Sequence, residues 1–296
     1  MATRVVISAP RPAPFFTPLF VAIDKGFLAE QGLEGVMRYE AGLEEMARGE
    51  VDFAGSSLAY RSFVEGAPVR QICGLSSRET SHILMVRPDM ESPQQLEHIL
   101  IPASTGRVGD RFVEELRSIL ALNGVTLEES GIESQGVQGS HKEQWQMLKE
   151  GIGDGATLGA PWWIIAARDG WRSLGHQSDY RPSASGAGVY VAPETIATRP
   201  DVVRGFVQAY VKSLRYCLEN VDGTLESIMK FSREWGVDSP EIARGAYDEV
   251  APYWRLEIDL PSLDGAIKQA CERLGKPALS ADTFVDMRFL EEALAR

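Results

Sequence analysis

Residues 12–33 read PAPFFTPLFVAIDKGFLAEQGL, and they contain the pattern that decides the fold. A short apolar run, Val5–Ile7, precedes them and is typical of a buried strand. The prolines from Pro12 onward predict a stiff turn, and residues 18–31 then have the apolar spacing of a helix that Gly32 ends. Strand, sharp loop and helix start follow one another, so the unpaired amides of the helix N-terminus lie at the end of the strand.

The same alternation of apolar runs and helix-period segments continues over the first two-thirds of the chain, which is typical of an α/β sheet with crossover helices. From residue 193 onward the pattern predicts helices, at 200–220, 224–235, 240–250, 261–274 and 281–294. The first of these has apolar residues at helical spacing. They are Val203, Phe206, Val207, Tyr210, Val211 and Leu214. The sequence therefore predicts an α/β protein with an all-helical tail.

Composition excludes some classes of partner. The 296 residues include 42 acids and 30 bases, and the net charge of −12 argues against nucleic-acid or anionic-membrane binding. No apolar run approaches the ~20 residues of a membrane span. Residues 1–4 lead directly into the first strand without a signal peptide, which predicts a cytoplasmic protein, or a periplasmic one if a leader was removed.

The three cysteines, Cys73, Cys217 and Cys271, are far apart in the chain and have no histidine at ligand spacing. Such a sparse, odd set predicts reduced thiols that are buried as small apolar residues. The sequence contains no metal-ligand cluster, no GxSxG motif and no phosphate-binding P-loop, so we expect no metal and no cofactor.

Candidate ligand-binding residues follow the predicted strands, where open α/β sheets bind ligands. Phe15 and Phe16 are predicted to form the aromatic wall of a pocket. The alternative is that one of them packs under the first helix and the other has no specific role. Glu40 ends a predicted strand, where its carboxylate could pair with a ligand amine or with an arginine. The alternative is that this carboxylate is a solvated surface charge. Ser56 and Ser57 offer hydroxyls and amides to an oxyanion, although one serine could serve only as an N-cap.

A second group lies directly before the longest predicted crossover helix, 108–123. Ser104, Thr105 and Arg107 combine hydroxyls, free amides and a guanidinium, which suits a carboxylate, sulfonate or phosphate. The alternative is that Arg107 lies on the surface and pairs with Asp110 or Glu114.

Two histidines and a tryptophan complete the candidates. His82 heads a predicted strand, where a histidine is more often structural. Ser140 and His141 precede a helix whose N-terminus favours a neutral, hydrogen-bonding imidazole. Trp162 and Trp163 share one helix start and cannot both be well buried, so one of them is predicted to stack on a flat ligand.

Five short motifs in order resemble the type II periplasmic-binding-protein-like family, in the branch of the nitrate, taurine and alkanesulfonate binders and the thiamine-pyrimidine synthases. They lie at residues 14–33, 46–54, 66–70 and 148–156 and at Pro161. The cysteine-rich motif of the pyrimidine synthases has no match here, and the first strand–helix loop lacks the nucleophilic cysteine of the desulfinases.

The resemblance implies two Rossmann-like α/β lobes joined by a two-strand hinge, with the ligand in a cleft between them. Lobe 1 would comprise residues 1–86 and 189–296, with the helical C-terminal tail packed on it, and lobe 2 residues 87–188. The loops after residues 9, 40, 55, 104 and 139, together with Pro161, would line the cleft.

We therefore predict a small-molecule-binding protein that closes on an organic anion, a carboxylate or sulfonate with or without an aromatic part. The resemblance implies a role like that of ABC-transporter substrate-binding proteins, with an ABC permease as partner if the chain is exported. The alternative is a cytosolic lyase or decarboxylase on the same scaffold, with His82 or His141 as the acid–base group.

Overall fold

The computed structural model describes residues 2–39, 41–57, 59–77, 82–104, 107–108, 110–138, 141–176 and 186–295. The side chains of residues 104, 107, 108, 110, 111 and 176 lie outside this description. The chain divides into two compact units. The first comprises residues 1–79, 183–234 and 247–296, and the second comprises residues 80–182 and 235–246.

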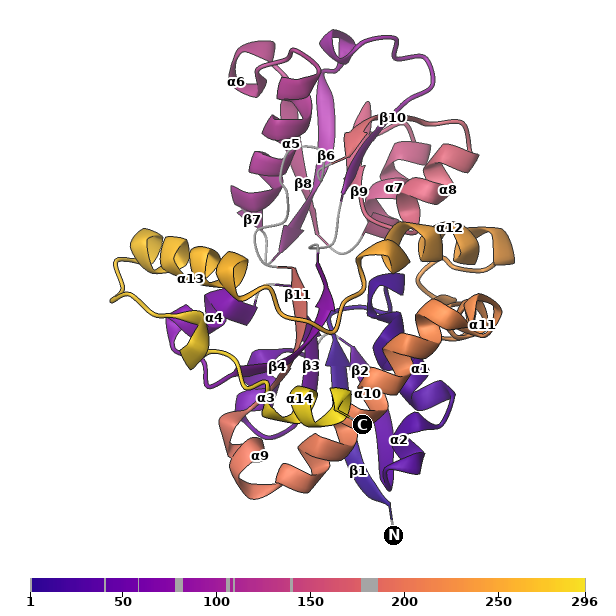
Figure 1. Ribbon diagram of the computed structural model, residues 1–296. Helices are drawn as coiled ribbons and strands as arrows, with labels where there is room; N and C mark the ends of the chain where they lie inside the picture. The colour runs from indigo at the N-terminus through magenta and orange to yellow at the C-terminus, as the bar shows by residue number, and fades with distance from the viewer. Residues whose placement is uncertain are drawn as a thin grey trace. The chain divides into compact units, whose positions relative to one another are not determined.

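The first unit contains a five-stranded sheet of order β2-β1-β3-β11-β4 (Figure 1). Its strands are β1 (Thr3–Ala9), β2 (Leu33–Tyr39), β3 (Phe53–Ser56), β4 (Arg70–Ser76) and β11 (Ala187–Val191). β1 pairs in parallel with β2 and β3, whereas β11 is antiparallel to both of its neighbours. The carboxyl ends of β1, β2, β3 and β4 therefore lie at one edge of the sheet.

Helices cover both faces of this sheet. They are α1 (Thr17–Asp24), α2 (Phe27–Glu30), α3 (Leu43–Ala47), α4 (Ala59–Glu65), α9 (Pro193–Thr198), α10 (Pro200–Glu219), α11 (Val221–Ser232), α13 (Leu260–Leu274) and α14 (Arg288–Leu294), with single 3-10 turns η1 (Pro14–Phe16), η4 (Ala251–Tyr253) and η5 (Ala281–Thr283). The single helix predicted at 18–31 is divided into α1 and α2, because Gly26 takes a left-handed conformation with φ 77°. The helix predicted at 281–294 forms only as η5 and α14.

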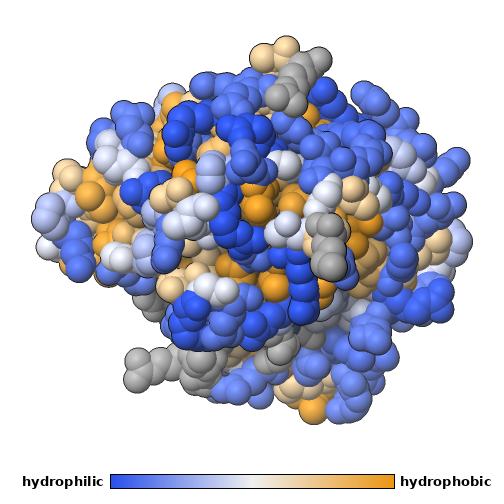
Figure 2. Space-filling model, turned by 90° about the horizontal axis from the view of Figure 1, so that it is seen from below, coloured by the Kyte–Doolittle hydropathy of each residue, from blue (hydrophilic) through white to orange (hydrophobic). Residues whose placement is uncertain are grey.

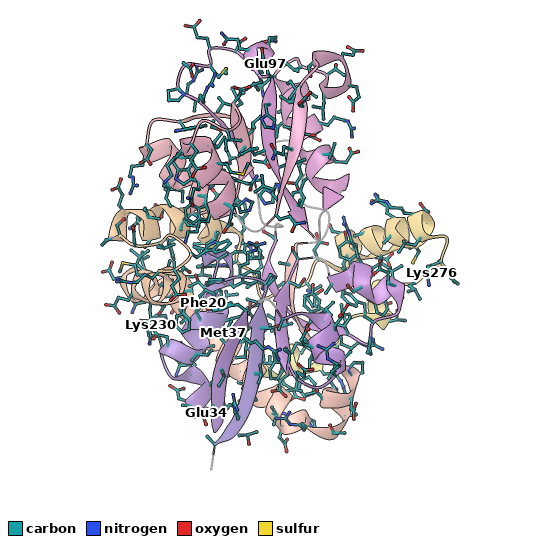
Figure 3. All side chains as sticks on the ribbon, turned by 180° about the vertical axis from the view of Figure 1, so that it is seen from behind. Phe20, Glu34, Met37, Glu97, Lys230 and Lys276 are labelled. Atoms are coloured by element: carbon teal, nitrogen blue, oxygen red, sulfur yellow. The ribbon has the colours of Figure 1, made fainter. Side chains whose placement is uncertain are left out.

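The long helix α10 contributes much of the core on one face. All six of its residues that were predicted to face the core are buried, which confirms the helical pattern. Phe206 stacks on Phe53 of β3, with ring centroids 3.7 Å apart, and the hydroxyl of Tyr210 donates to the carbonyl of Gly74 over 3.0 Å. Figure 3 shows Phe20 of α1 directed into this unit and Lys230 at its surface.

The C-terminal tail covers the outer edge of β4. The amide of Gly74 donates to the carbonyl of Leu256, and the amide of Ser77 donates to the carbonyl of Tyr253, each over 2.7 Å. Residues 284–286 pair with the start of the same strand. Because an open edge strand invites pairing with other chains, this tail completes the sheet as well as adding helices.

The second unit contains a six-stranded mixed sheet. In the order β10-β5-β9-β6-β7, with β8 also paired to β6, its strands are β10 (Arg172–His176), β5 (Ile83–Val86), β9 (Gly155–Leu158), β6 (His98–Ser104), β7 (Arg107–Val108) and β8 (Glu133–Gln138). Its helices are α5 (Asp110–Leu122), α6 (Leu127–Ser130), α7 (His141–Lys149), α8 (Trp162–Arg168) and the first part of α12 (Pro240–Val250), with one 3-10 turn, η2 (Pro93–Gln95). The buried core between α5 and the sheet includes Leu84, Ile99 and Leu116.

The division differs in two places from the predicted lobes. Residues 83–86, assigned to lobe 1, form β5, whose antiparallel pairing with β9 and β10 places it within the second sheet. Residues 235–246, assigned to the tail of lobe 1, belong to the second unit. Two glycines of this segment allow it to pack closely on α8 of the second unit, because Gly236 lies against the ring of Trp162 and Gly245 lies against Ile164. The predicted hinge stays a prediction.

Two aspartates in the family-like motifs have the same structural role. Asp52, just before β3, accepts the backbone amide of Val6 over 2.7 Å. Asp154, just before β9, accepts the amides of Glu97 and His98 over 2.8 and 2.9 Å. Each carboxylate therefore fixes the start of a central strand to a neighbouring strand. This structural role accounts for the presence of an aspartate in both motifs.

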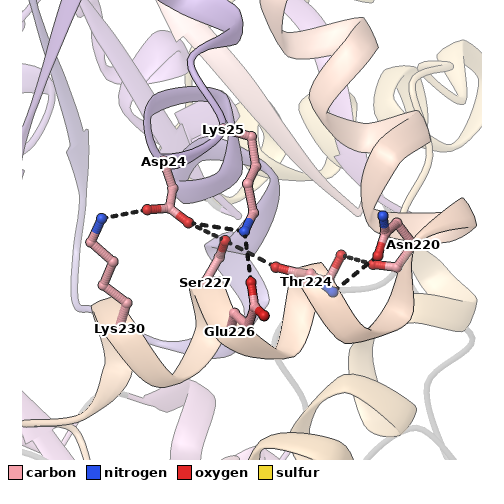
Figure 4. Close-up of polar contacts among 8 residues, drawn as sticks. Asp24, Lys25, Asn220, Thr224, Glu226, Ser227 and Lys230 are labelled. Atoms are coloured by element: carbon pink, nitrogen blue, oxygen red, sulfur yellow. Dashed lines mark hydrogen bonds and ion pairs between the residues drawn. The ribbon is translucent and has the colours of Figure 1, made fainter.

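The Asp24–Lys25 pair of the opening motif also has a structural role (Figure 4). The Asp24 carboxylate accepts hydrogen bonds from Lys230 and from the hydroxyl of Ser227, both on α11, while Lys25 lies 3.1 Å from Glu226. Burial by itself raises the pKa of the Asp24 carboxyl, but the hydrogen bonds from Lys230 and Ser227 outweigh it, so the pKa lies below its ordinary value of 3.8. This cluster joins α1 to α11.

We expect the Asp24→Asn variant to lose about 1 kcal/mol of stability at pH 7, a small value because Lys230 is exposed and its charge is screened. Since the folded-state pKa is depressed, the stabilisation is complete above about pH 3.8 and is lost as the pH falls through the lower folded value. Urea unfolding at pH 7 and pH 3 should therefore show a smaller acid-induced loss in the variant. Asp201→Asn, whose carboxylate is 96% exposed, is the control. Equal acid sensitivity of Asp24→Asn and the unmodified chain would contradict this role.

The cysteine prediction is confirmed, since Cys73, Cys217 and Cys271 are free and buried. Burial raises the pKa of the Cys73 thiol well above its ordinary value and that of Cys217 to about 12, which excludes both as thiolate nucleophiles near neutral pH. Figure 2 shows polar and charged residues over most of the face seen from below, with smaller apolar areas between them. Within the part of the chain that the structure describes, we find no helix with the length and apolar character needed to cross a bilayer.

Candidate ligand site

Phe15 and Phe16 lie where the chain leaves β1, in the turn η1. Their rings meet edge to face with centroids 5.2 Å apart, and each residue is 6% exposed. Phe16 packs against Gly55 of β3, where an added Cβ would lie 3.0 Å from its Cδ1. Gly55 therefore makes room for Phe16, which agrees with the alternative that one of the two aromatics packs into the core.

Trp254 holds this turn in place from the C-terminal tail. Its side chain is fully buried, and its Nε1 donates to the carbonyl of Phe15 over 3.2 Å. Tyr247 packs edge to face against the same indole at 5.7 Å. The segment that carries Trp254 is itself paired to β4, so the sheet edge, the tail and the aromatic turn form one connected structure.

Ser56 ends β3 at the same edge of the sheet and Ser57 follows it directly, and both residues are half-buried. The pairing of Ser56 with Gly188 of β11 fixes its backbone. The two hydroxyls are therefore at the carboxyl edge of the sheet, as predicted, and their contact with a ligand stays a prediction. Glu40, at the end of β2, lies outside the described residues.

In the second unit, β6, β8 and β9 are parallel, so their carboxyl ends meet at one edge of the sheet. The antiparallel β5 starts at the same edge, since Ile83 pairs with Leu158. This register brings His82 next to Gly159, although the two are far apart in sequence. The chain following β8 continues into α7, whose first residue is His141.

His82 forms a buried pair with an acid that the sequence reading missed. Its Nδ1 lies 2.8 Å from Oε2 of Glu115, and these residues are 5% and 1% exposed. The ring of Phe112 packs edge to face against the imidazole at 5.6 Å. A histidine oriented by a buried carboxylate can bind a ligand or transfer a proton.

His141 belongs to a second hydrogen-bonded chain. Its Nδ1 lies 2.8 Å from Oε1 of Gln144, and Nε2 of Gln144 donates to the carbonyl of Leu100 over 3.1 Å. The imidazole rings of His82 and His141 are 4.9 Å apart. A Cβ at Gly159 would lie 3.0 Å from Nε2 of His141, so the two histidines converge on a residue without a side chain.

Trp162 is the more buried of the two neighbouring tryptophans, and its stacking on a flat ligand stays a prediction. It is 6% exposed, its benzo edge lies against Gly236, and Trp235 packs edge to face on it at 6.4 Å. It lines a pocket of about 290 Å³ within the second unit, together with Trp145 and Ile242 and the cations Lys142, Lys149 and Arg168. Among the described residues, its Nε1 has no hydrogen-bond partner.

The remaining candidates are described only in part. Ser104 ends β6 and Arg107 begins the short antiparallel strand β7, but their side chains lie outside the described set. Thr105 and Ser140 lie outside it altogether. Nowhere in the described ranges do three or more His, Cys, Asp or Glu side chains come together in a way that could hold a metal ion.

One missed residue had a sequence signal. Glu115 occupies an apolar helical position, with Phe112, Leu116 and Ile119 at neighbouring turns of α5, and an acid among core positions is rarely buried without a partner. Trp254 had no such signal, because it follows a proline in a stretch without periodicity. The position of Gln144 on the buried face of α7 also gave no indication of its two partners.

The two α/β units, each with aromatic or polar side chains at the carboxyl edge of its sheet, resemble the architecture of periplasmic-binding-protein-like proteins. Residues 13–142 match the model of the family described as "NMT1/THI5 like". The chain is 25% identical over 310 residues to the riboflavin-binding protein RibY of Chloroflexus aurantiacus, a match that covers 94% of this chain and 82% of that protein.

Solved structures share the fold over almost the whole chain. The alkanesulfonate-binding protein SsuA of Xanthomonas axonopodis pv. citri, bound to MOPS, aligns with a TM-score of 0.72 and 13% identity, covering 96% of this chain and 98% of that one. The desulfurization enzyme DSZB aligns with a TM-score of 0.70 and 16% identity, with 99% of each chain covered. The α/β fold class and the resemblance to the type II periplasmic-binding-protein-like family are therefore confirmed.

Proposed function

We propose that this chain is a small-molecule-binding protein of the ABC import type, which closes two lobes on an organic anion with a flat part. The observation that supports it most is the placement of Phe15, Ser56, Ser57, His82 and His141 at the carboxyl edges of the two sheets. Ligands of open α/β sheets bind at these edges. A ligand that contacts both units would bind the closed form more tightly and so drive closure.

The relatives support this class of ligand. RibY is named for binding riboflavin, which has a flat ring system, and SsuA for binding alkanesulfonates, which are organic anions. In this chain the serines and the segment 104–107 would hold the acidic group, while Phe15, Phe16 and Trp162 would cover the apolar part. An ABC permease is the expected partner if the protein is exported.

Calorimetry with riboflavin, an alkanesulfonate, an aromatic carboxylate and nitrate tests the proposal. We expect micromolar or tighter binding of at least one organic compound of this panel, with a negative heat-capacity change from burial of apolar surface. Arg107→Ala should weaken the binding of an anionic ligand by roughly 1.5–3 kcal/mol if its guanidinium contacts the anion.

Arg117→Ala is the matched control, because that guanidinium is on α5 and pairs with Glu114 and Glu128. It should leave the affinity unchanged. Absence of binding for the whole panel by the folded protein would refute the proposal.

The second candidate is a lyase or decarboxylase that uses His82 or His141 as its acid–base group. The buried hydrogen bond between His82 and Glu115 is the observation that favours it. The binding proteins among the relatives weigh against it. Long incubation of a bound panel compound decides between the two, since recovery of the compound unchanged favours binding, and turnover that His82→Gln abolishes favours the enzyme.

A further inference from the structure

We infer that the second unit carries a further binding site, for a small aromatic carboxylate, in the pocket of about 290 Å³ between α7, α8 and residues 236–242. All of its described lining residues belong to the second unit. The inference goes beyond the proposed function, because among the described candidates for the cleft ligand Trp162 alone also lines this pocket.

Three separate stretches of the chain form the pocket. The first is one face of α7, whose lining residues recur every three or four positions. The second is α8, which lies beside α7 (Figure 1). The third is the segment 236–242, which belongs to the second unit although the chain on both sides of residues 235–246 belongs to the first. A ligand in this pocket therefore contacts all three stretches and holds the segment against the two helices.

The floor of the pocket is apolar. Trp145, Trp162, Ile165 and Ile242 line it, and each is at most 8% exposed. Protein interiors are close-packed, so a hollow of this size among buried apolar side chains is typical of a small-molecule site. Its volume is at the lower end of the ~300–1,000 Å³ of such pockets, which limits the occupant to one or two fused rings.

The rim has more positive than negative charge. The described lining residues include three cations and two acids. Arg168 is paired with one of the acids, since its Nε lies 3.2 Å from the carboxylate of Asp169. Lys142 and Lys149 on α7 then outnumber Asp238, the second acid. This balance favours an anionic ligand over a cationic one.

Lys149 is the cation that sets the direction of the ligand. Its ammonium lies 5.8 Å from the centre of the Trp145 ring, and within the described part of the chain no carboxylate pairs with it. A flat ring that carries a carboxylate matches this arrangement, because the ring contacts the tryptophans while the carboxylate approaches the ammonium. The two features together define the ligand class as a small aromatic acid.

The indole N–H signals report on this pocket directly. A ¹⁵N–¹H correlation spectrum of the labelled full chain contains one such signal for each of the six tryptophans, and Trp145→Phe and Trp162→Phe assign the two that matter. Nε1 of Trp162 has no hydrogen-bond partner among the described residues, so its signal should respond to a nearby acceptor. We expect 2-naphthoate at millimolar concentration to shift both signals. We expect 2-naphthamide, which has the same rings without the charge, to bind at least about tenfold more weakly.

Lys149→Gln tests the direction of the ligand. It should weaken the binding of 2-naphthoate about fivefold and leave that of 2-naphthamide unchanged. Lys276→Gln is the matched control, because it removes the same charge from an exposed lysine of the first unit (Figure 3) and should change neither affinity. Absence of shifts at both indoles, equal affinity for the two compounds, or no effect of Lys149→Gln would each overturn the inference.

Hydrogen exchange tests the third wall. The amide of Ala243 donates to the carbonyl of Ser239 over 3.0 Å at the start of α12. With 2-naphthoate at ten times its dissociation constant, exchange at this amide should slow about tenfold. Unchanged exchange would show that the segment is no part of the site. The cleft is tested separately, since binding that Lys149→Gln weakens and Arg107→Ala does not belongs to this pocket, and the reverse result belongs to the cleft.

Discussion

Trp254→Ala is expected to unfold the first unit at a much lower denaturant concentration than the unmodified protein, with a loss of about 3–5 kcal/mol. Its indole is the largest fully buried side chain among the residues that the structure describes, and its removal leaves a cavity beside Tyr247. It also removes the donor for the carbonyl of Phe15, which is buried in the aromatic turn. Urea unfolding followed by far-UV circular dichroism measures the change in the free energy of unfolding.

Trp254→Phe separates the two contributions. Phenylalanine keeps most of the buried ring but has no N–H, so we expect a loss nearer 1 kcal/mol together with faster hydrogen exchange at the amide of Phe16, which bonds to Ala13 in the same turn. If Trp254→Ala unfolded at the same urea concentration as the unmodified chain, the tail could not be holding this turn in place.

Gly74→Ala is expected to destabilise the protein by about 1–3 kcal/mol although it adds only one methyl group. The new Cβ would lie 2.4 Å from the carbonyl oxygen of Glu257, 2.7 Å from that of Arg255 and 2.9 Å from that of Leu256. All three are backbone atoms in the segment paired to β4, so no side-chain rotation relieves the clash, and the segment must move away from the strand.

The control for this variant is Gly265→Ala. Gly265 lies inside α13 with no atom within 4 Å of an added Cβ, so the same substitution should stabilise the protein by about 0.5–1 kcal/mol through helix propensity. Thermal unfolding of both variants should thus show shifts of opposite sign. If Gly74→Ala left the unfolding temperature unchanged, the close contact between the tail and β4 would not contribute to stability.

Local periodicity was enough to predict most of the secondary structure. The apolar spacing in α10, the helix-ending glycines and the buried runs of β1, β3 and β9 are each determined by residues close together in the sequence. The order of the motifs then predicted the α/β fold. The acids of those motifs, Asp24, Asp52 and Asp154, proved to fasten elements together, a role that depends on partners the motif does not contain.

The sequence by itself thus determined the fold class and the loops in which polar and aromatic residues follow the strands. Only the tertiary structure decided which side chains meet there. Trp254 reaches Phe15 across 239 positions, and His82 reaches Glu115 across 33. The register that brings Gly159 beside two histidines is likewise set by strand pairing. The physical reason is that helix and strand patterns report the period of one element, whereas a site is formed by hydrogen bonds and packing between elements, which no local pattern encodes.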